Sequence, residues 1–459
     1  MIHPMLPQTL KKLSQTKNFA GIQQLCSSIH PARVADALTK FSPQHIGEVL
    51  TVIKPRTRAT IFSYLAQPLQ KNIVEFFKRN TLIEMVAYMP ADRRVDFFNQ
   101  LPEASQELLL PALAHAEREN ILKLAAYPPG TAGAVMTSDY AALLAELTAS
   151  EAIAKLRREA PDRETIYYTY VVDADRRLIG FVSLKDLILA NSDRRVADIM
   201  HRDVIHSRAT DDQEDAALKI QKYDLIALPI VNEDNILVGI ITHDDAIDIF
   251  AQEHTEDMEK LMAITGSHDH FSYMRTTVWT HFKNRSGWIF ILALLGLVSG
   301  YIVQNFGTLL LQIAMITSFI PMLTDTGGNT GSQSATLVVR ALAVNEITPR
   351  DSLAVLFMEG KVAILLGILL GIFSFARVVL FARNGSIPGD HSLVAIGAAI
   401  ATAMGLQVIT ATLIGALLPL AAAKLKLDPA VVASPALTTI VDITGLLIFF
   451  VTIKLFLGI

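Results

Sequence analysis

The sequence predicts a multidomain protein with an all-α N-terminal superhelical domain, a tandem pair of α/β units and an α-helical membrane domain of five spans. Three observations lead to this architecture. Prolines divide residues 1–130 into short helical segments, an internal repeat lies within residues 131–250, and long apolar segments fill residues 286–459. We expect residues 251–285 to form a helix that connects the α/β pair to the membrane domain.

Composition separates a soluble part from a membrane part. The chain has 459 residues, of which 51% are hydrophobic and 18% are charged. Residues 1–285 carry a net charge of −5, whereas the remainder contains only seven acids and eight bases. The single cysteine, Cys26, cannot form an intramolecular disulfide and fits a reducing cytosol. The N-terminus has no apolar run, so we expect no cleaved signal peptide.

Residues 1–130 are predicted to form short amphipathic helices. Apolar residues recur at helical spacing, as at Val34, Leu38 and Phe41. Prolines fall near the expected helix starts, where the missing amide hydrogen costs no hydrogen bond. They are Pro31, Pro43, Pro55, Pro68, Pro90, Pro102 and Pro111. Similar segments recur within residues 53–113 and indicate a stacked helical array. No catalytic constellation appears here, so we expect a regulatory or docking domain.

The internal repeat lies 59 positions apart and relates residues 170–183 to residues 229–242. Each copy predicts a strand, a turn of Asp or Asn character, and a second strand after a glycine. Ser183 and Thr242 then occupy the N-cap position of a following helix. The segments that open the two copies, 132–136 and 197–200, both end in Met. This repeat resembles a pair of CBS motifs, which fold side by side and often sense a ligand.

The second copy and the residues after it are acidic. Residues 211–257 contain 13 acids but only two bases, Lys219 and Lys222. Such a run is compatible with a solvated surface. It is also compatible with a divalent-cation sensor, because close carboxylates repel one another and Mg²⁺ or Ca²⁺ relieves that repulsion through oxygen or water ligands.

Five segments are long enough to cross a bilayer. They are residues 287–304, 309–341, 353–380, 393–423 and 434–457. His281, Lys283 and Arg285 precede the first segment and place that end on the cytoplasmic side. The basic second and fourth connections are also predicted inside, which puts the C-terminus outside. Arg377 and Arg383, in the third connection, run against this rule.

Asp442 is a lone acid inside the last apolar segment, with Thr438 and Gly445 on the same helical face. A carboxylate at membrane depth costs about 2.5–3.5 kcal/mol, so a cation, water or a base must compensate it. The alternatives to an ion site are an ion pair with a lysine such as Lys361, or a protonated Asp in a helix contact. Glu359 is close to Lys361 in sequence and is assigned a local pair with it.

A polar stretch at residues 320–333 lies within the second apolar segment. Its glycines, Gly327, Gly328 and Gly331, allow helices to approach closely or expose backbone carbonyls. A packing motif explains these glycines but not Asn329 or Asp325. Neutral oxygens around one carboxylate suit a cation such as Mg²⁺, which gives up its water shell reluctantly. Asp325 is interpreted as a second pore charge or as a residue of the pore mouth.

Residues 321–336 and 428–445 together resemble the signatures of the MgtE magnesium channel family. The order of helical domain, CBS pair, connecting helix and five spans also matches that family, so the resemblance covers essentially the whole chain. It implies a homodimer with a pore between the two membrane domains. It further implies that Asp442 attracts hydrated Mg²⁺, with contributions from Asn329 and from carbonyls near Gly328.

The same resemblance implies that intracellular Mg²⁺ binds between acidic surfaces of the soluble domains and closes the pore. The positions that match the sensor are Asp92, Asp96, Asp212, Glu214, Asp224, Asp245, Glu253, Glu256, Asp257 and Asp428. Some relatives also bind ATP at the CBS pair, and the sequence leaves this open here. Two features depart from the family pattern: Ser434 stands where Asn is expected, and residues 265–270 differ from the usual connecting helix.

These inferences predict a Mg²⁺-selective, Mg²⁺-gated channel of the plasma (inner) membrane with cytoplasmic N-terminal domains. The expected partners are Mg²⁺, lipid and a second copy of the chain, and no nucleic acid. An ion-coupled Mg²⁺ carrier or exporter is the first alternative, and a CBS-bearing sensor that passes no ions is the second. An enzyme is not expected, because the sequence has no His/Cys metal cluster and no phosphate loop with lysine.

Overall fold

The computed structural model describes residues 5–264, 276–381, 392–432 and 435–458. These residues form two compact units that divide between Glu253 and His254, and each unit is described by itself. The predicted helix break at 265–267, the altered segment 265–270, Arg383 and Ser434 all lie outside the described residues.

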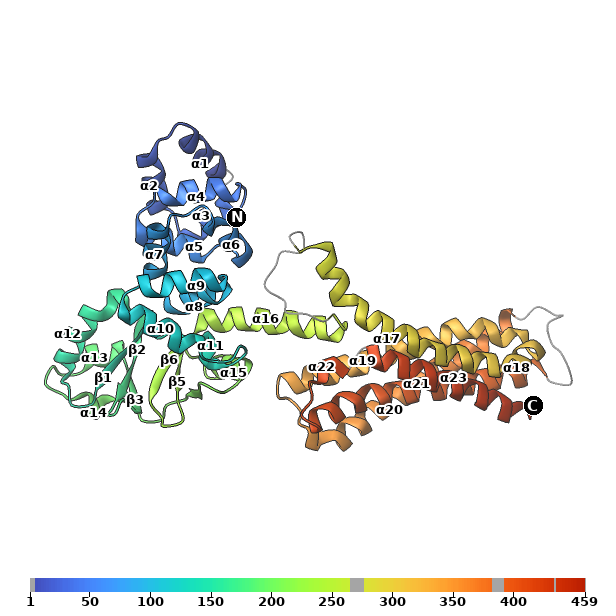
Figure 1. Ribbon diagram of the computed structural model, residues 1–459. Coiled ribbons are helices and arrows are strands. Elements are labelled where there is room, and N and C mark those ends of the chain that lie inside the picture. The colour runs from blue at the N-terminus through green and yellow to red at the C-terminus, as the bar shows by residue number, and fades with distance from the viewer. Residues whose placement is uncertain (1–4, 265–275, 382–391, 433–434, 459) are drawn as a thin grey trace. The chain divides into compact units, whose positions relative to one another are not determined.

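The N-terminal domain of the first unit is all helical, as predicted (Figure 1). Its helices are α1 (Leu6–Gln15), α2 (Phe19–Ser28), α3 (Pro31–Leu38), α4 (Pro43–Thr51), α5 (Pro55–Ser63), α6 (Gln67–Val74), α7 (Arg79–Tyr88), α8 (Ala91–Gln100), α9 (Glu103–Leu109) and α10 (His115–Ala125). Helices α3, α4 and α5 begin at the predicted prolines. Alternate helices pack on one another, α3 on α5 on α7 and α4 on α6 on α8, so the array is superhelical.

The tandem α/β pair follows in the same unit. The first copy contains α11 (Ala132–Val135), β1 (Tyr140–Leu144), α12 (Ala149–Glu159), β2 (Thr165–Val172), β3 (Leu178–Ser183) and α13 (Leu184–Leu189). The second contains α14 (Val196–Ile199), β4 (Ser207–Arg208), α15 (Gln213–Lys222), β5 (Ala227–Val231), β6 (Leu237–Thr242) and α16 (His243–Leu261), and the part of α16 from His254 onward belongs to the second unit. In each sheet the first two strands are parallel and the last two antiparallel. The predicted repeat is therefore confirmed.

The two copies exchange their opening segments. Thr137, which follows α11, exchanges two backbone hydrogen bonds with Ile240 of β6 in the second copy. His201, which follows α14, does the same with Phe181 of β3 in the first copy. The glycine of each sheet makes room for the crossing segment, since a Cβ on Gly239 would lie 2.6 Å from the Met136 sulfur. Each sheet is thus completed by the other copy.

The second unit contains the membrane helices. Its elements are α17 (Val278–Asn305), α18 (Gly307–Gln312), a 3₁₀ segment (Ala314–Phe319), α19 (Ile320–Ala343), α20 (Ser352–Phe381), α21 (Leu393–Lys424), α22 (Pro429–Val432) and α23 (Pro435–Leu457). The long helices run alongside one another (Figure 1). Helix α21 packs against α19, α20 and α23, and so lies at the centre of the bundle.

Four helical segments among the described residues are long and apolar enough to cross a bilayer. They are Val278–Asn305, Pro349–Phe381, Leu393–Lys424 and Ala436–Leu457. Helix α19 has 24 residues but is too polar to meet the same criterion, so the five-span count stays a prediction that depends on α19. The predicted second segment, 309–341, is not one helix, because the chain leaves helical geometry at Ile313 before α19 begins.

Candidate functional site

One face of helix α19 is polar, and no other part of the chain that the structure describes covers it. We call Asp325, Asn329, Gln333, Thr336 and Arg340 the polar stripe, since spacings of three and four residues place them on one side of the helix. Asn329 Nδ2 donates a hydrogen bond to Asp325 Oδ1 at 3.1 Å. Lipid cannot satisfy these groups, so the stripe requires another protein surface or water.

The opposite face of α19 carries the glycines and is buried. A Cβ on Gly331 would lie 3.1 Å from the backbone oxygen of Ala411 in α21, and one on Gly328 would lie 3.5 Å from Thr438 in α23. Helix α19 stays helical through this stretch. Of the two roles predicted for the glycines, the structure shows the close approach of helices.

Asp442 is half-buried on α23. Its Oδ1 atom is shielded from solvent and accepts no hydrogen bond from any residue that the structure describes. Lys361 lies over the Phe357 ring, with Nζ 4.3 Å from the ring centroid, and makes no ion pair within the described part of the chain. Glu359 instead accepts a hydrogen bond from Ser334 of α19 at 2.8 Å. The predicted local pair of Glu359 with Lys361 is therefore wrong.

Arg377, which ran against the topology rule, has a structural partner. Its guanidinium donates to the backbone oxygen of Ser318 at 3.2 and 3.3 Å and lies over the Phe319 ring. Its charge is satisfied within the protein, so it does not need to be assigned to the cytoplasmic side.

A first acidic group joins the N-terminal domain to the second CBS-like copy. Asp92 and Asp96 lie on α8, and Asp245 and Asp248 lie on the first turns of α16. Arg93 bridges the two helices: its Nη2 is 2.8 Å from Asp248 Oδ2, and its Nε is 3.4 Å from Asp92 Oδ2. The sequence predicted three of these acids as sensor residues but assigned no role to Arg93.

The raised pKa values in the first acidic group indicate that binding of a cation there would be favourable. Burial raises the pKa of Asp92 to about 6, and neighbouring Arg93 only partly offsets this. Burial likewise raises the pKa of Asp96, although this side chain keeps solvent access, and that of Asp245, each to about 6. Asp92 also raises the pKa of Asp245 through repulsion. The three carboxylates are therefore held together at an electrostatic cost that a cation would reduce.

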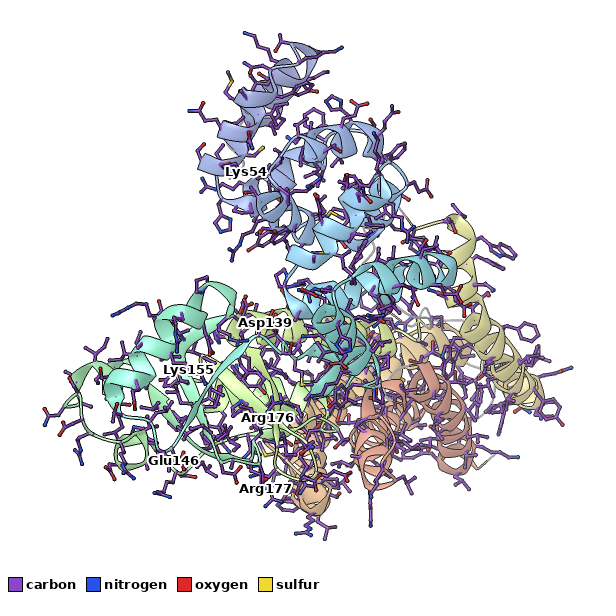
Figure 2. The ribbon with its side chains drawn as sticks, turned by 60° about the vertical axis from the view of Figure 1, so that its left-hand side comes forward. Lys54, Asp139, Glu146, Lys155, Arg176 and Arg177 are labelled. Carbon is purple, nitrogen blue, oxygen red and sulfur yellow. The ribbon has the colours of Figure 1, made fainter. Side chains whose placement is uncertain are left out.

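Glu164, the residue immediately before β2, belongs to the same group and was not predicted. Burial raises its pKa to about 7, and the charges of Asp92, Asp245, Asp244 and Asp139 add to the shift. Its amide donates to the backbone oxygen of Asp139 at 2.8 Å. Figure 2 shows Asp139 on the part of the first copy nearest the N-terminal helices. No repeat signal marks Glu164, because the equivalent position in the second copy is Tyr223.

Four other predicted sensor residues lie in α15 or close to it. Asp212 is the N-cap of α15 and accepts a hydrogen bond from the amide of Glu214 at 2.7 Å. Asp224 follows the helix with a φ of 50°, and Glu253 accepts a hydrogen bond from Gln213. Asp212 thus caps the start of α15, and Asp224 has a left-handed backbone conformation just after its end. The sensor role of these residues stays a prediction.

The remaining predicted sensor residues meet in the second unit. Lys260 Nζ lies 2.7 Å from Glu256 Oε1 and 2.8 Å from Asp428 Oδ2, so it ties the end of α16 to the segment that begins α22. Burial raises the pKa of Asp257, and the charge of Asp428 adds to this. Glu256, Asp257 and Asp428 therefore lie close together, and their sensor role stays a prediction; Lys260 was not predicted.

The described residues contain no set of three or more His, Cys, Asp or Glu side chains arranged to ligate one metal ion directly. Two of the acidic groups already hold a basic side chain between carboxylates. A cation at these places would thus contact the protein partly through water, or would displace the base.

A helical array, a tandem α/β pair that carries acidic surfaces, and a membrane bundle with an internal carboxylate define a membrane transporter with regulatory domains. Residues 29–130 match the MgtE intracellular N domain, residues 132–193 and 196–252 match CBS domains, and residues 320–452 match the divalent cation transporter domain of MgtE. The sequence is 34% identical to the magnesium transporter MgtE of Thermus thermophilus over 98% of both chains. The chain belongs to the MgtE family of transporters.

Other relatives agree with this assignment. The magnesium transporter MgtE of Bacillus subtilis is 33% identical over 74% of this chain and 73% of its own length. The crystal structure of the soluble part of a magnesium transporter shares 30% identity with a TM-score of 0.52, covering 55% of this chain and 98% of that one. The cytosolic domain of the Mg²⁺ channel MgtE in complex with ATP shares 33% identity with a TM-score of 0.51, covering 53% and 99%.

Proposed function

We propose that this protein is a Mg²⁺ channel for magnesium uptake that cytoplasmic Mg²⁺ closes. The observation that carries the proposal is Asp442, a carboxylate inside an apolar bundle with one oxygen that no described residue satisfies. Mg²⁺ prefers oxygen ligands and retains several waters, so one carboxylate among neutral oxygens is a suitable site. The relatives named as magnesium transporters supply the identity of the ion.

The polar stripe supports a pore between two copies of the chain. Asp325, Asn329 and Gln333 are exposed on the protomer, in a helix that packs on α21 and α23 through its other face. A second copy facing the stripe would remove it from lipid and enclose a water-filled path. We therefore propose a homodimer in which α19 lines the path and Asp442, Asn329 and Gly328 belong to the ion site.

The acidic groups support closure by Mg²⁺. In low Mg²⁺, repulsion among Asp92, Asp96 and Asp245 favours separation of α8 from α16. Bound Mg²⁺ would bridge these carboxylates and stabilise the compact arrangement, which shifts the channel toward its closed state. Because a related cytosolic domain binds ATP, we also propose ATP as a ligand of the CBS pair, to be tested by calorimetry with and without Mg²⁺.

The test is Mg²⁺ flux into liposomes that contain the purified full chain. We expect wild-type flux to follow the electrochemical gradient without a counter-ion and to fall at high Mg²⁺ on the cytoplasmic side. Asp442→Ala should abolish flux, whereas Glu346→Gln, which removes an exposed carboxylate elsewhere in the same unit, should not. Flux that requires a counter-ion would favour the carrier, and no flux under any condition would leave only a sensor.

A further inference from the structure

Gln407 is a buried amide at the middle of α21, the central helix of the bundle. Its side chain is 1% exposed. The Nε2 atom donates a hydrogen bond to the backbone oxygen of Leu323 in α19 at 3.3 Å. The Oε1 atom is shielded from solvent and accepts no hydrogen bond from the residues that the structure describes. One half of this amide therefore has a partner and the other half lacks one.

The same amide fills the space between α19 and α23. A Cβ on Gly445 of α23 would lie 3.0 Å from Gln407 Cγ and 3.2 Å from Nε2. A Cβ on Gly327 of α19 would overlap Nε2. Gly445 is one turn beyond Asp442 on α23, whereas Gly327 is on the buried face of α19, opposite to Asn329. Gln407 thus sets the separation of the two helices at this level.

The free oxygen is the feature that packing does not explain. A buried acceptor without a donor is unfavourable, and methionine would fill a similar volume without that penalty. Asp442 Oδ1, on the neighbouring turn of α23, is a second shielded acceptor without a donor among the described residues. The Gln407 amide lies against Gly445, which is one turn from Asp442 on α23. Water molecules, including those that a hydrated cation carries, would supply the donors that both acceptors lack.

We propose that Gln407 is a positioning residue of the ion path. Its nitrogen holds α21 against α19, and its oxygen accepts a hydrogen bond from water in the shell of the divalent cation at Asp442. Gln407 thereby contributes to the choice of a strongly hydrated ion such as Mg²⁺ over a less tightly hydrated one such as Ca²⁺. This inference rests on the proposed transport function.

The experiment compares the full chain with Gln407→Met in liposomes, and measures the Mg²⁺ concentration for half-maximal flux, the ratio of Mg²⁺ to Ca²⁺ flux, and the unfolding midpoint. The variant loses the water-mediated contact of the oxygen together with the hydrogen bond to Leu323. It should raise the half-saturating Mg²⁺ or lower the flux ratio about fivefold, while the protein still folds with a clear unfolding midpoint. Thr412→Val is the matched control, because Thr412 is equally buried in α21 and bonds only to Val408 of its own helix. It should leave both quantities unchanged.

A second variant separates positioning from packing. Gly327→Ala alone should prevent normal assembly of the bundle. Adding Gln407→Ala should restore most of it, because the overlapping amide is removed and only Val441 Cγ1, 3.0 Å from the new methyl group, has to shift. The restored double variant should still show the fivefold change. Wild-type flux ratio and half-saturation in Gln407→Met, or in the double variant, would overturn the inference. Absence of Mg²⁺ flux in the wild type would overturn the proposed function itself.

Discussion

Arg93 supplies a positive charge within the first acidic group. Its removal should therefore increase the stabilisation of the protein by Mg²⁺. The guanidinium bridges Asp92 and Asp248 and partly neutralises the same carboxylates to which a divalent ion would bind. In Arg93→Gln the apo form loses this bridge, while the Mg²⁺-bound form loses a repulsive neighbour. Both effects increase the difference in stability between the apo and Mg²⁺-bound forms.

The magnitude follows from the geometry. A Mg²⁺ ion that reached Asp248 through a water ligand would lie ~6 Å from the guanidinium, where the repulsion between +2 and +1 charges in water is ~1.4 kcal/mol. The solvent value of the dielectric applies, because Arg93 and Asp248 are 42% and 66% exposed. This free energy corresponds to about tenfold in Mg²⁺ affinity, and to a shift of about 3–5 °C in the unfolding midpoint of a domain of this size.

The assay is thermal unfolding of the full chain with a chelator and at fixed millimolar Mg²⁺, in low monovalent salt to limit screening. The Mg²⁺-induced rise of the midpoint should be larger in Arg93→Gln than in the wild type. Arg33→Gln is the control, since Arg33 is an exposed arginine on α3 outside the acidic group. An equal or smaller rise in Arg93→Gln would refute the reasoning.

Three further predictions concern other parts of the molecule. Lys260→Met removes the bridge to Asp428 and should raise flux several-fold in the absence of cytoplasmic Mg²⁺, because a partly exposed pair of this kind contributes about 1 kcal/mol. Gly239→Ala should destabilise the CBS pair by about 1–3 kcal/mol, since its methyl group would overlap the Met136 sulfur. Burial raises the pKa of the Cys26 thiol to about 11, so the native thiol should resist alkylation at pH 8. The contribution of this thiol to the unfolding free energy should fall by up to about 1.4 kcal/mol per pH unit between pH 9 and 11, where the unfolded chain loses the proton and the folded chain keeps it.

Each of these predictions has a result that would contradict it. Unchanged flux of Lys260→Met in a chelator would show that this ion pair does not restrain the channel. Gly239→Ala should be compared with Gly296→Ala, where no atom lies within 4 Å of the new methyl group, and equal unfolding midpoints would be inconsistent with the packing argument. Rapid alkylation of Cys26 in the folded protein would show that the thiol is more accessible or more acidic than its burial implies.

The elements that the sequence predicted well have strong local signals. Prolines marked the starts of α3, α4 and α5, and the repeat of residues 170–183 at 229–242 marked both sheets. The start of α19 was not predicted, because residues 309–320 are largely apolar, and this composition fits one long helix as well as the observed short pieces. Hydropathy measures polarity but does not locate a break such as the one at Ile313.

The parts that sequence missed depend on tertiary proximity. Arg93 and Lys260 are ordinary basic residues in sequence, and only the fold places each between two carboxylates. Glu164 joins the first acidic group because β2 begins beside Asp139, which no local pattern indicates. Asp212 caps the start of α15 and Asp224 follows its end, and the sensor role that the sequence suggested for them stays a prediction.

The exchange of opening segments between the two CBS domains makes them inseparable as building blocks. A cut between residues 193 and 196 would leave β6 without the strand-like segment at Thr137 and β3 without that at His201. Neither half would then retain a complete sheet of its own. To transfer this regulatory module into another transporter, the junctions should therefore lie before residue 131 and after β6, so that both copies are transferred as one piece.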